Sequence, residues 1–209
     1  MKKKLIERFA VEHLLPSLPG FCVRGNLIYE VPVGCILRAF LFDSSGFSAT
    51  TFYPHVFVQA LYIPFGHLTL TPGKRFPGHW EFLPDNEPEL ARKLLNQVHA
   101  MGLPFLRENS TPEGLIREAR ANPAIKVNSR IRQQLAYSLV LLGRNDEGLD
   151  ELDVLLAMIN QKSDPAPWER DLHTEIGTLR EKLMRNPREV VETLQQWTEQ
   201  TRAKLNLPS

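Results

Sequence analysis

The sequence predicts an α+β protein, with an N-terminal helix on a small antiparallel sheet followed by a C-terminal bundle of about six helices. Two observations carry this prediction. Short runs of β-branched and aromatic residues, separated by Gly-, Pro- and Ser-rich breaks, fill residues 21–84. After Pro88, apolar residues recur at the three- and four-residue spacing of amphipathic helices. We expect an α+β domain over residues 1–105 and a helical domain over residues 106–209.

The first expected element is an amphipathic helix that ends at Pro16. Its apolar positions keep helical spacing: Leu5, Ile6, Phe9, Ala10 and Leu14. Strand candidates follow at residues 27–31, 35–42, 55–61 and 68–71, and the segment around Trp80 is a loop or a short extra strand. The breaks between them are too short for helical crossovers, so the strands are expected to pair in antiparallel order.

Capping and breaking residues divide the helical half. Residues 110–113, Ser-Thr-Pro-Glu, form a capping box with a proline near the first turn. Gly102 and Gly143 are placed to end helices, and Asn186-Pro187 separates the last two. The expected helices therefore begin near residues 88, 111, 129, 146, 165 and 187.

Composition argues against several classes of protein. The chain has 209 residues, 43% hydrophobic and 23% charged, which is typical of a globular protein with a sizeable core. Its net charge of +1 gives no overall field to attract a nucleic acid. No apolar run approaches the roughly 20 residues that cross a bilayer, and charged residues interrupt the N-terminus where a secretory signal would be apolar. We expect a cytoplasmic protein that binds neither membranes nor nucleic acids.

The two cysteines, Cys22 and Cys35, form neither a disulfide framework nor a CxxC motif, so they are expected to be buried thiols. Three histidines, His55, His67 and His79, follow each other at equal spacing, and three imidazoles can bind zinc. No carboxylate pair accompanies them, and the intervals are long for a metal site. The sequence therefore predicts no metal and no cofactor.

One short motif offers catalytic chemistry. Gly66-His67-Leu68-Thr69-Leu70 resembles the His-apolar-Thr-apolar motif of the two-histidine phosphoesterases. On a strand, His67 and Thr69 would face the same side, so an imidazole acid or base and a hydroxyl donor would meet a phosphate together. That family uses two such motifs, and the sequence around His55 has Phe57 where Thr is needed. A phosphoesterase or nucleotide-binding enzyme that uses His67 and Thr69 is the alternative function.

Residues 129–161 resemble one tetratricopeptide repeat. Leu142-Gly143 ends one helix, Asp146-Glu147 opens the next, and the small Gly148 lies where the two helices would cross. The chain departs from the family pattern at Arg132, Leu155 and Asn160. No second copy follows, although such repeats normally occur in groups of at least about three. A repeat-like hairpin and an ordinary helical hairpin both stay open, and both favour an interaction surface over an active site.

Five carboxylates lie close together on the second helix of this hairpin: Asp146, Glu147, Asp150, Glu151 and Asp153. The helix dipole explains the first two, which lie at its N-terminus. The others form either a solvated helix face or an acidic face for a basic partner. We take these five as the candidate partner-binding residues. Trp168 and Trp197 mark two further helices as surfaces to test, because tryptophan is favoured at binding hot spots. Tryptophan is also a common core residue, and we expect both of these in the core.

The N-terminal half, from Leu18-Pro19-Gly20-Phe21 through residues 58–64, resembles small uncharacterised bacterial α+β domains found beside toxin and immunity genes. That resemblance implies a stoichiometric binder, such as a protein that covers a toxin. The sequence therefore predicts a non-catalytic protein–protein interaction module, of the immunity or adaptor kind, with a protein partner. A structural subunit of a larger assembly is a further alternative, and it would expose a large apolar patch. The sequence predicts no particular oligomeric state.

Overall fold

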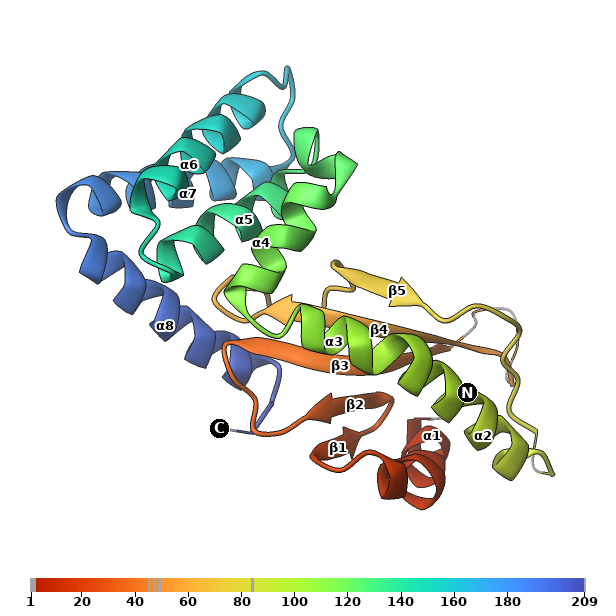
Figure 1. Ribbon diagram of the computed structural model, residues 1–209. Helices are drawn as coiled ribbons and strands as arrows, with labels where there is room; N and C mark the ends of the chain where they lie inside the picture. Colours follow the sequence, from red (N-terminus) through yellow and green to blue (C-terminus); the bar gives the residue numbers. More distant parts are fainter. Residues whose placement is uncertain (1–2, 45, 47, 49, 84, 209) are drawn as a thin grey trace. The chain divides into compact units, whose positions relative to one another are not determined.

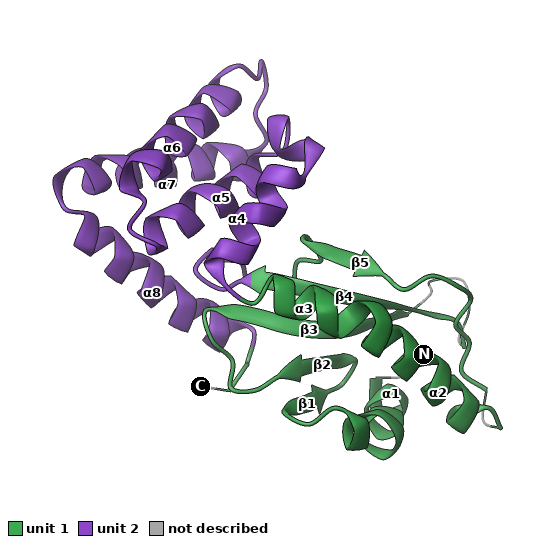
Figure 2. Ribbon diagram, viewed as in Figure 1, with its two compact units in different colours: residues 1–59, 67–110, 206–209 green, residues 60–66, 111–205 purple. Residues whose placement is uncertain are grey.

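The computed structural model describes residues 3–44, 46, 48, 50–83 and 85–208. The chain divides into two compact units (Figure 2). We call residues 1–59, 67–110 and 206–209 the sheet unit, and residues 60–66 and 111–205 the helical unit. The predicted α+β class, with the strands first and the helical bundle after them, is confirmed (Figure 1). The sequence predicted a single boundary after residue 105. In the structure, segment 60–66 belongs to the helical unit and segment 206–209 belongs to the sheet unit.

The sheet unit contains a five-stranded sheet in which neighbours in the chain are neighbours in space. The strands are β1 (Phe21–Arg24), β2 (Leu27–Glu30), β3 (Ile36–Ser44), β4 (Phe52–Ala60) and β5 (Gly73–Arg75). β1 and β2 form a tight hairpin in which Phe21 pairs with Glu30. Gly25 has a φ of 61° at the first position of the turn, where a two-residue hairpin favours glycine. The antiparallel meander expected from the short connections is therefore present.

The strand expected at residues 68–71 is wrong. Gln59 on β4 is buried, and its side chain takes the place of a strand neighbour. Its Nε2 donates to the carbonyl oxygen of His67 at 3.2 Å, and its Oε1 accepts from the backbone N–H of Thr69 at 3.0 Å. Pairing with β4 begins only at Gly73, where a Cβ would lie 2.4 Å from the carbonyl oxygen of Leu70. Only glycine tolerates that approach.

Two helical segments complete the sheet unit. α1 (Lys3–Phe9) continues through a π-helical turn (Ala10–Leu14), and its predicted apolar face is buried except at Leu5. α2 (Glu87–Gln97) and α3 (Leu103–Glu108) are joined by a second π-helical turn (Val98–Gly102) and run along one face of the sheet (Figure 1). A Cβ on Gly102 would lie 2.6 Å from the Phe40 ring on β3. The missing side chain therefore lets the turn pack directly on the sheet.

The helical unit contains five α-helices within the residues that the structure describes. The sixth expected helix, which begins near residue 88, is α2 of the sheet unit. They are α4 (Pro112–Ala121), α5 (Ser129–Leu141), α6 (Asn145–Asn160), α7 (Pro167–Arg185) and α8 (Pro187–Lys204). The Thr111 hydroxyl caps α4 by accepting from Gly114 N–H, and the Asn128 side chain caps α5. α5 is the central helix, because it is buried on almost every side and packs against α4, α6 and α8.

α5 and α6 form the predicted helical hairpin. Gly143 has a φ of 72° between them, as expected for a glycine that ends a helix. Gly148 lies where the two helices cross, and a Cβ there would come within 2.7 Å of Val140 on α5. The likeness to a single tetratricopeptide repeat stays a prediction, since any tightly crossing hairpin meets the same requirements.

The exposure of the cysteines and the character of the helices bear on two further expectations. Cys22 and Cys35 are both exposed, so the expectation of buried thiols is wrong. Cys22 lies on β1, the strand at one edge of the sheet, where alternate residues are exposed. Among the described residues, no helix combines the length and the apolar character required to cross a membrane.

Candidate functional site

The acidic cluster on α6 is largely paired inside the helical unit. Glu147 accepts from Arg144 Nε and Nη2, both at 2.6 Å, and from Arg120 Nη2 at 2.8 Å. The hydrogen bonds from these two guanidinium groups lower the pKa of Glu147 to about 2. Glu151 forms an ion pair with Arg132, and Asp153 forms one with Arg180 on α7. Three of the five carboxylates are therefore paired with arginines.

Asp146 and Asp150 are the remaining members of the predicted partner-binding set. Both are exposed, and neither has a side-chain partner among the residues that the structure describes. Two aspartates near the start of a helix are stabilised by its dipole and by water. The five carboxylates thus share one helix, but they do not present five free charges to a partner.

His67 and Thr69, the catalytic candidates, lie on the irregular segment that follows Ile63 rather than on a strand. His67 is exposed, Thr69 is half-buried, and Gln59 holds the backbone of both. The strand geometry that would point both side chains into one cleft is therefore absent from this described segment. Their proposed roles in phosphoester chemistry stay a prediction from the motif alone.

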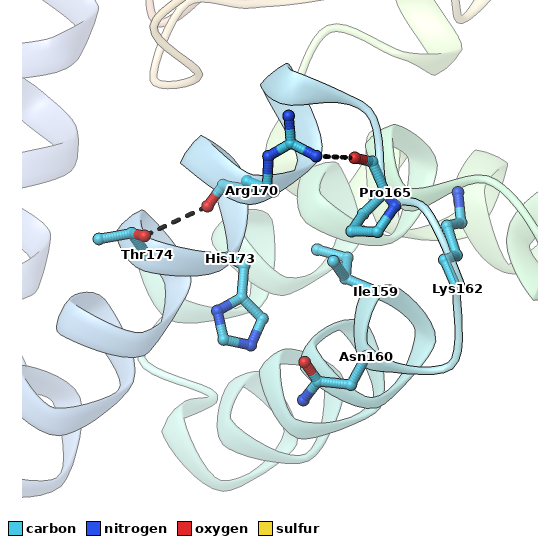
Figure 3. Close-up of a pocket in the computed structure, with 7 residues that line it drawn as sticks. All are labelled: Ile159, Asn160, Lys162, Pro165, Arg170, His173 and Thr174. Carbon is cyan, nitrogen blue, oxygen red and sulfur yellow. Dashed lines mark hydrogen bonds between the residues drawn. The ribbon is translucent and has the colours of Figure 1, made fainter.

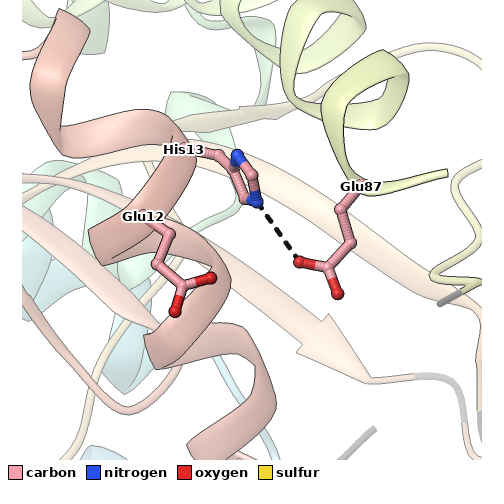
Figure 4. A group of neighbouring side chains, drawn as sticks. All are labelled: Glu12, His13 and Glu87. Atoms are coloured by element: carbon pink, nitrogen blue, oxygen red, sulfur yellow. Dashed lines mark ion pairs between the residues drawn. The ribbon is translucent and has the colours of Figure 1, made fainter. Parts of the chain in front are cut away.

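A different group of metal-ligand residues comes together in the sheet unit. Ligand atoms of Glu12, His13 and Glu87 all lie within 4.8 Å of one another (Figure 4). A histidine with two carboxylates suits zinc or iron. However, Arg8 Nη2 donates to Glu87 Oε1 at 2.5 Å, and His13 Nε2 lies 3.3 Å from Glu87 Oε2. An ion-pair network explains this group, since Arg8 already supplies the countercharge. Sequence reasoning missed it because Glu87 is distant in the chain.

The loop between α6 and α7 borders a shallow cavity of about 400 Å³ (Figure 3). Lys162, Arg170 and His173 give it a basic lining. Lys162 Nζ donates to Glu169 Oε1 at 2.5 Å, and Arg170 Nη1 donates to the carbonyl oxygen of Pro165 at 2.6 Å. Both cations therefore hold the loop against the first turn of α7. Since both have partners within the protein, the cavity does not require a ligand to account for its basic lining.

A second cavity in the helical unit is built around a stacked arginine. The guanidinium carbon of Arg130, on α5, lies 4.3 Å from the centroid of the Trp168 ring and 4.8 Å from that of Phe65. Its Nη1 donates to Gln133 Oε1 at 2.9 Å. Two aromatic contacts and a hydrogen bond fix the guanidinium in one orientation. Trp168, at the start of α7, keeps 42% of its surface exposed even so.

The same cavity is lined by a partly buried carboxylate, Glu175. Its Oε1 accepts from the Tyr137 hydroxyl at 2.6 Å and from Gln133 Nε2 at 3.2 Å. Burial raises the pKa of Glu175, although the hydrogen bonds and Arg130 oppose that shift. Burial, together with the neighbouring carboxylate, also raises the pKa of Tyr137 well above its usual value. The ionised form of Glu175 is therefore less favourable here than in water, because burial removes part of its solvation.

We call this cavity the Trp168 pocket. Its aromatic and polar lining consists of Phe65, Arg130, Gln133, Trp168, Asp171 and Glu175. The volume is about 160 Å³, well below the roughly 300–1,000 Å³ of pockets that hold drug-sized ligands. The pocket fits one amino-acid side chain. Of these residues, only Trp168 was noted from the sequence, because Phe65 and the two α5 residues, Arg130 and Gln133, are distant from it in the chain.

Trp197, the second tryptophan considered, is half-buried on α8. Its ring lies 6.0 Å from that of Tyr137, measured between centroids. It therefore contributes to the interior of the helical unit rather than to the pocket.

A scan of the chain against protein-family models finds no match, and comparisons with curated proteins and with solved structures find none either. The geometry of the Trp168 pocket is thus the strongest basis for a functional proposal.

Proposed function

We propose that the protein is a cytoplasmic, non-catalytic protein–protein interaction module that binds its partner through the surface around Trp168. The observation that supports this is a tryptophan that is 42% exposed and stacked on an arginine. Tryptophan and arginine are enriched among the few residues that carry most of the energy of a protein interface. The immunity or adaptor role implied by the resemblance of the N-terminal half belongs to the same proposal.

Rigidity of the surface also supports binding. A side chain that is already fixed loses little conformational entropy when a partner covers it. Arg130 is held by two rings and by Gln133, and Trp168 is held by Arg130. A partner would therefore meet an ordered aromatic surface, with a side-chain-sized pocket beside it as an anchor point.

On α6, Asp146 and Asp150 offer a second, weaker contact region. Both are exposed, and no internal arginine neutralises either of them within the described residues. Charges at the rim of an interface mainly steer association and contribute little affinity. We therefore assign the main binding energy to the surface around Trp168 rather than to the acidic helix.

The test is affinity capture with tagged wild-type protein, a Trp168→Ala variant and a Met184→Ala variant. Met184 is also an exposed apolar residue of α7, at 55%, so it is a matched control. We expect a stoichiometric partner with the wild-type protein and with Met184→Ala. Trp168→Ala should weaken binding by about thirtyfold or more, which is the loss typical of a hot-spot residue.

Two results would contradict the proposal. A partner retained equally by Trp168→Ala would place the binding surface elsewhere. A partner lost only from an Asp150→Lys variant would place it on α6. Binding should be measured again with the purified partner by calorimetry, so that a change in affinity is separated from a change in expression.

A further inference from the structure

We propose that the Trp168 pocket binds an arginine side chain of the partner protein. This inference rests on the proposed function, since it names the chemical group that the interaction module recognises. It depends on three features of the pocket, which are its excess of negative charge, its unpaired carboxylates and its exposed aromatic ring.

The first feature is charge. The pocket is lined by one cation, Arg130, and by two carboxylates, Asp171 and Glu175. One negative charge is therefore in excess. A positively charged side chain from a partner would neutralise it, whereas an anionic one would add to it.

The second feature is that neither carboxylate forms an ion pair with a cation among the residues that the structure describes. Within the described chain, Arg130 forms no ion pair with Asp171 or with Glu175, and its Nη1 is used by Gln133. Both hydrogen bonds to Glu175 arrive at Oε1, so its Oε2 is left for another donor. A guanidinium group, with parallel N–H donors in a fixed plane, matches a carboxylate better than an ammonium does.

The third feature is the position of the aromatic ring. Trp168, Asp171 and Glu175 lie three and four residues apart on α7, so they share one face of the helix. A cation that reaches the two carboxylates therefore passes the exposed part of the tryptophan ring, where planar guanidinium groups stack favourably. Arg130 already makes this contact from within the protein at 4.3 Å.

The size of the pocket agrees with this occupant. Its volume of about 160 Å³ is about half the lower end of the range for pockets that hold drug-sized ligands. A single long side chain is closer to this size. The pocket therefore suits a single anchor residue, and the remainder of the partner would lie on the surrounding surface.

The test uses the full chain labelled with ¹⁵N and three probes, the N-acetyl amides of arginine, lysine and glutamate. The readout is the indole Nε1–H signal of Trp168, assigned by its loss in Trp168→Phe. We expect the arginine probe to shift this signal to saturation, the lysine probe to bind more weakly, and the glutamate probe to have no effect.

Two variants identify the groups involved. Asp171→Asn combined with Glu175→Gln should weaken arginine binding by about tenfold or more, since both counter-charges are lost. The amide of Glu175→Gln still accepts a hydrogen bond from Tyr137, so the fold is expected to persist, and circular dichroism checks this. Glu181→Gln removes an exposed charge from the same helix and should leave the affinity unchanged.

Several outcomes would overturn the inference. A response to glutamate but not to arginine would make Arg130 the recognition group. Equal or tighter binding of lysine would contradict recognition of a guanidinium group, and no saturation with any probe would show that the pocket takes no single side chain. If a partner is still captured in a Trp168-dependent way while the arginine probe fails, only this inference is wrong; if Trp168→Ala also leaves capture unchanged, the proposed function is wrong as well.

Discussion

Helices α6 and α7 lie next to each other in the helical unit, and both carry several acidic residues. On α6, Glu147, Glu151 and Asp153 are paired with arginines of other segments. On α7, Asp171 and Glu175 border a pocket, and no ion pair joins either of them to the nearby Arg130 within the described part of the chain. A dense acidic run is therefore a poor guide to free charge, because arginines of the fold neutralise three of its five carboxylates.

The largest effects are expected on the buried sides of the two helices, which should contribute equally to stability. Leu155 on α6 and Ile176 on α7 are both fully buried. Each substitution by alanine should lower the free energy of unfolding by about 2–5 kcal/mol, from lost transfer energy and a residual cavity. Urea denaturation measures this loss of unfolding free energy. Val154→Ala, on the exposed side of α6, is the control and should lower the unfolding free energy far less. A small effect at Ile176 would mean that α7 is loosely anchored.

The second prediction concerns the polar support of the pocket. Tyr137→Phe removes the donor to Glu175 and leaves a partly buried carboxylate under-satisfied. We expect a loss of about 1.5–3 kcal/mol, as for hydrogen bonds to charged groups. Tyr62→Phe removes a buried hydroxyl from a neutral partner, Ser138, and should cost about 0.5–1.5 kcal/mol.

The same tyrosine variant predicts a direction of titration. The hydrogen bond from Tyr137 lowers the pKa of Glu175, so its removal should raise that pKa further. Because a raised carboxyl pKa favours the protonated native state, stability falls as pH rises between the unfolded and folded values. The variant should therefore lose more stability over that interval than the wild-type protein does. An unchanged pH profile would argue against a strong contact between Tyr137 and Glu175.

The third prediction tests the pairing on α6. The folded pKa of Glu147 is about 2, below its usual value of 4.5, so its ionised form is favoured in the native state. Its contribution is fully present above the unfolded pKa and is lost as pH falls through the folded pKa. Wild-type protein should therefore be more stable than Glu147→Gln above pH 4.5, and the difference should shrink towards pH 2. A difference that is independent of pH would contradict the ion pairs.

The smallest effect is expected at Asp150. This residue is exposed and forms no ion pair within the described part of the chain, so Asp150→Asn should change stability by no more than about 0.5 kcal/mol. Thermal unfolding monitored by circular dichroism measures this. A larger loss would reveal a stabilising contact at Asp150 and would weaken the contrast between paired and unpaired acids on α6.

Local chemistry made much of the helical unit predictable. Thr111 and Asn128 cap the helices that their side chains suggested, and Gly143 adopts the positive φ expected at a helix end. Fewer features of the sheet were predictable. β1 was not expected, and the apparent strand at residues 68–71 is displaced because the Gln59 side chain binds its backbone. A side chain that substitutes for a strand leaves no periodic signal in the sequence.

The candidate site was predicted least well. The acidic residues of α6 were identified from their density, but Arg120, Arg132 and Arg180, which neutralise three of them, come from other segments. Trp168 was expected in the core, and this expectation is wrong because 42% of the residue is exposed. Its exposure and its stacking on Arg130 depend on how α5 and α7 pack, which no local pattern encodes.

The fold class, the amphipathic face of α1, the start of most helices and the hairpin of α5 and α6 could all be predicted from the amino-acid pattern. Helix caps and apolar periodicity act over a few residues, so they are visible along the chain. Which carboxylates are paired and which line a pocket depends on tertiary packing. Phe65, Arg130, Trp168 and Glu175 meet through packing between distant segments, and packing depends on the whole helical unit.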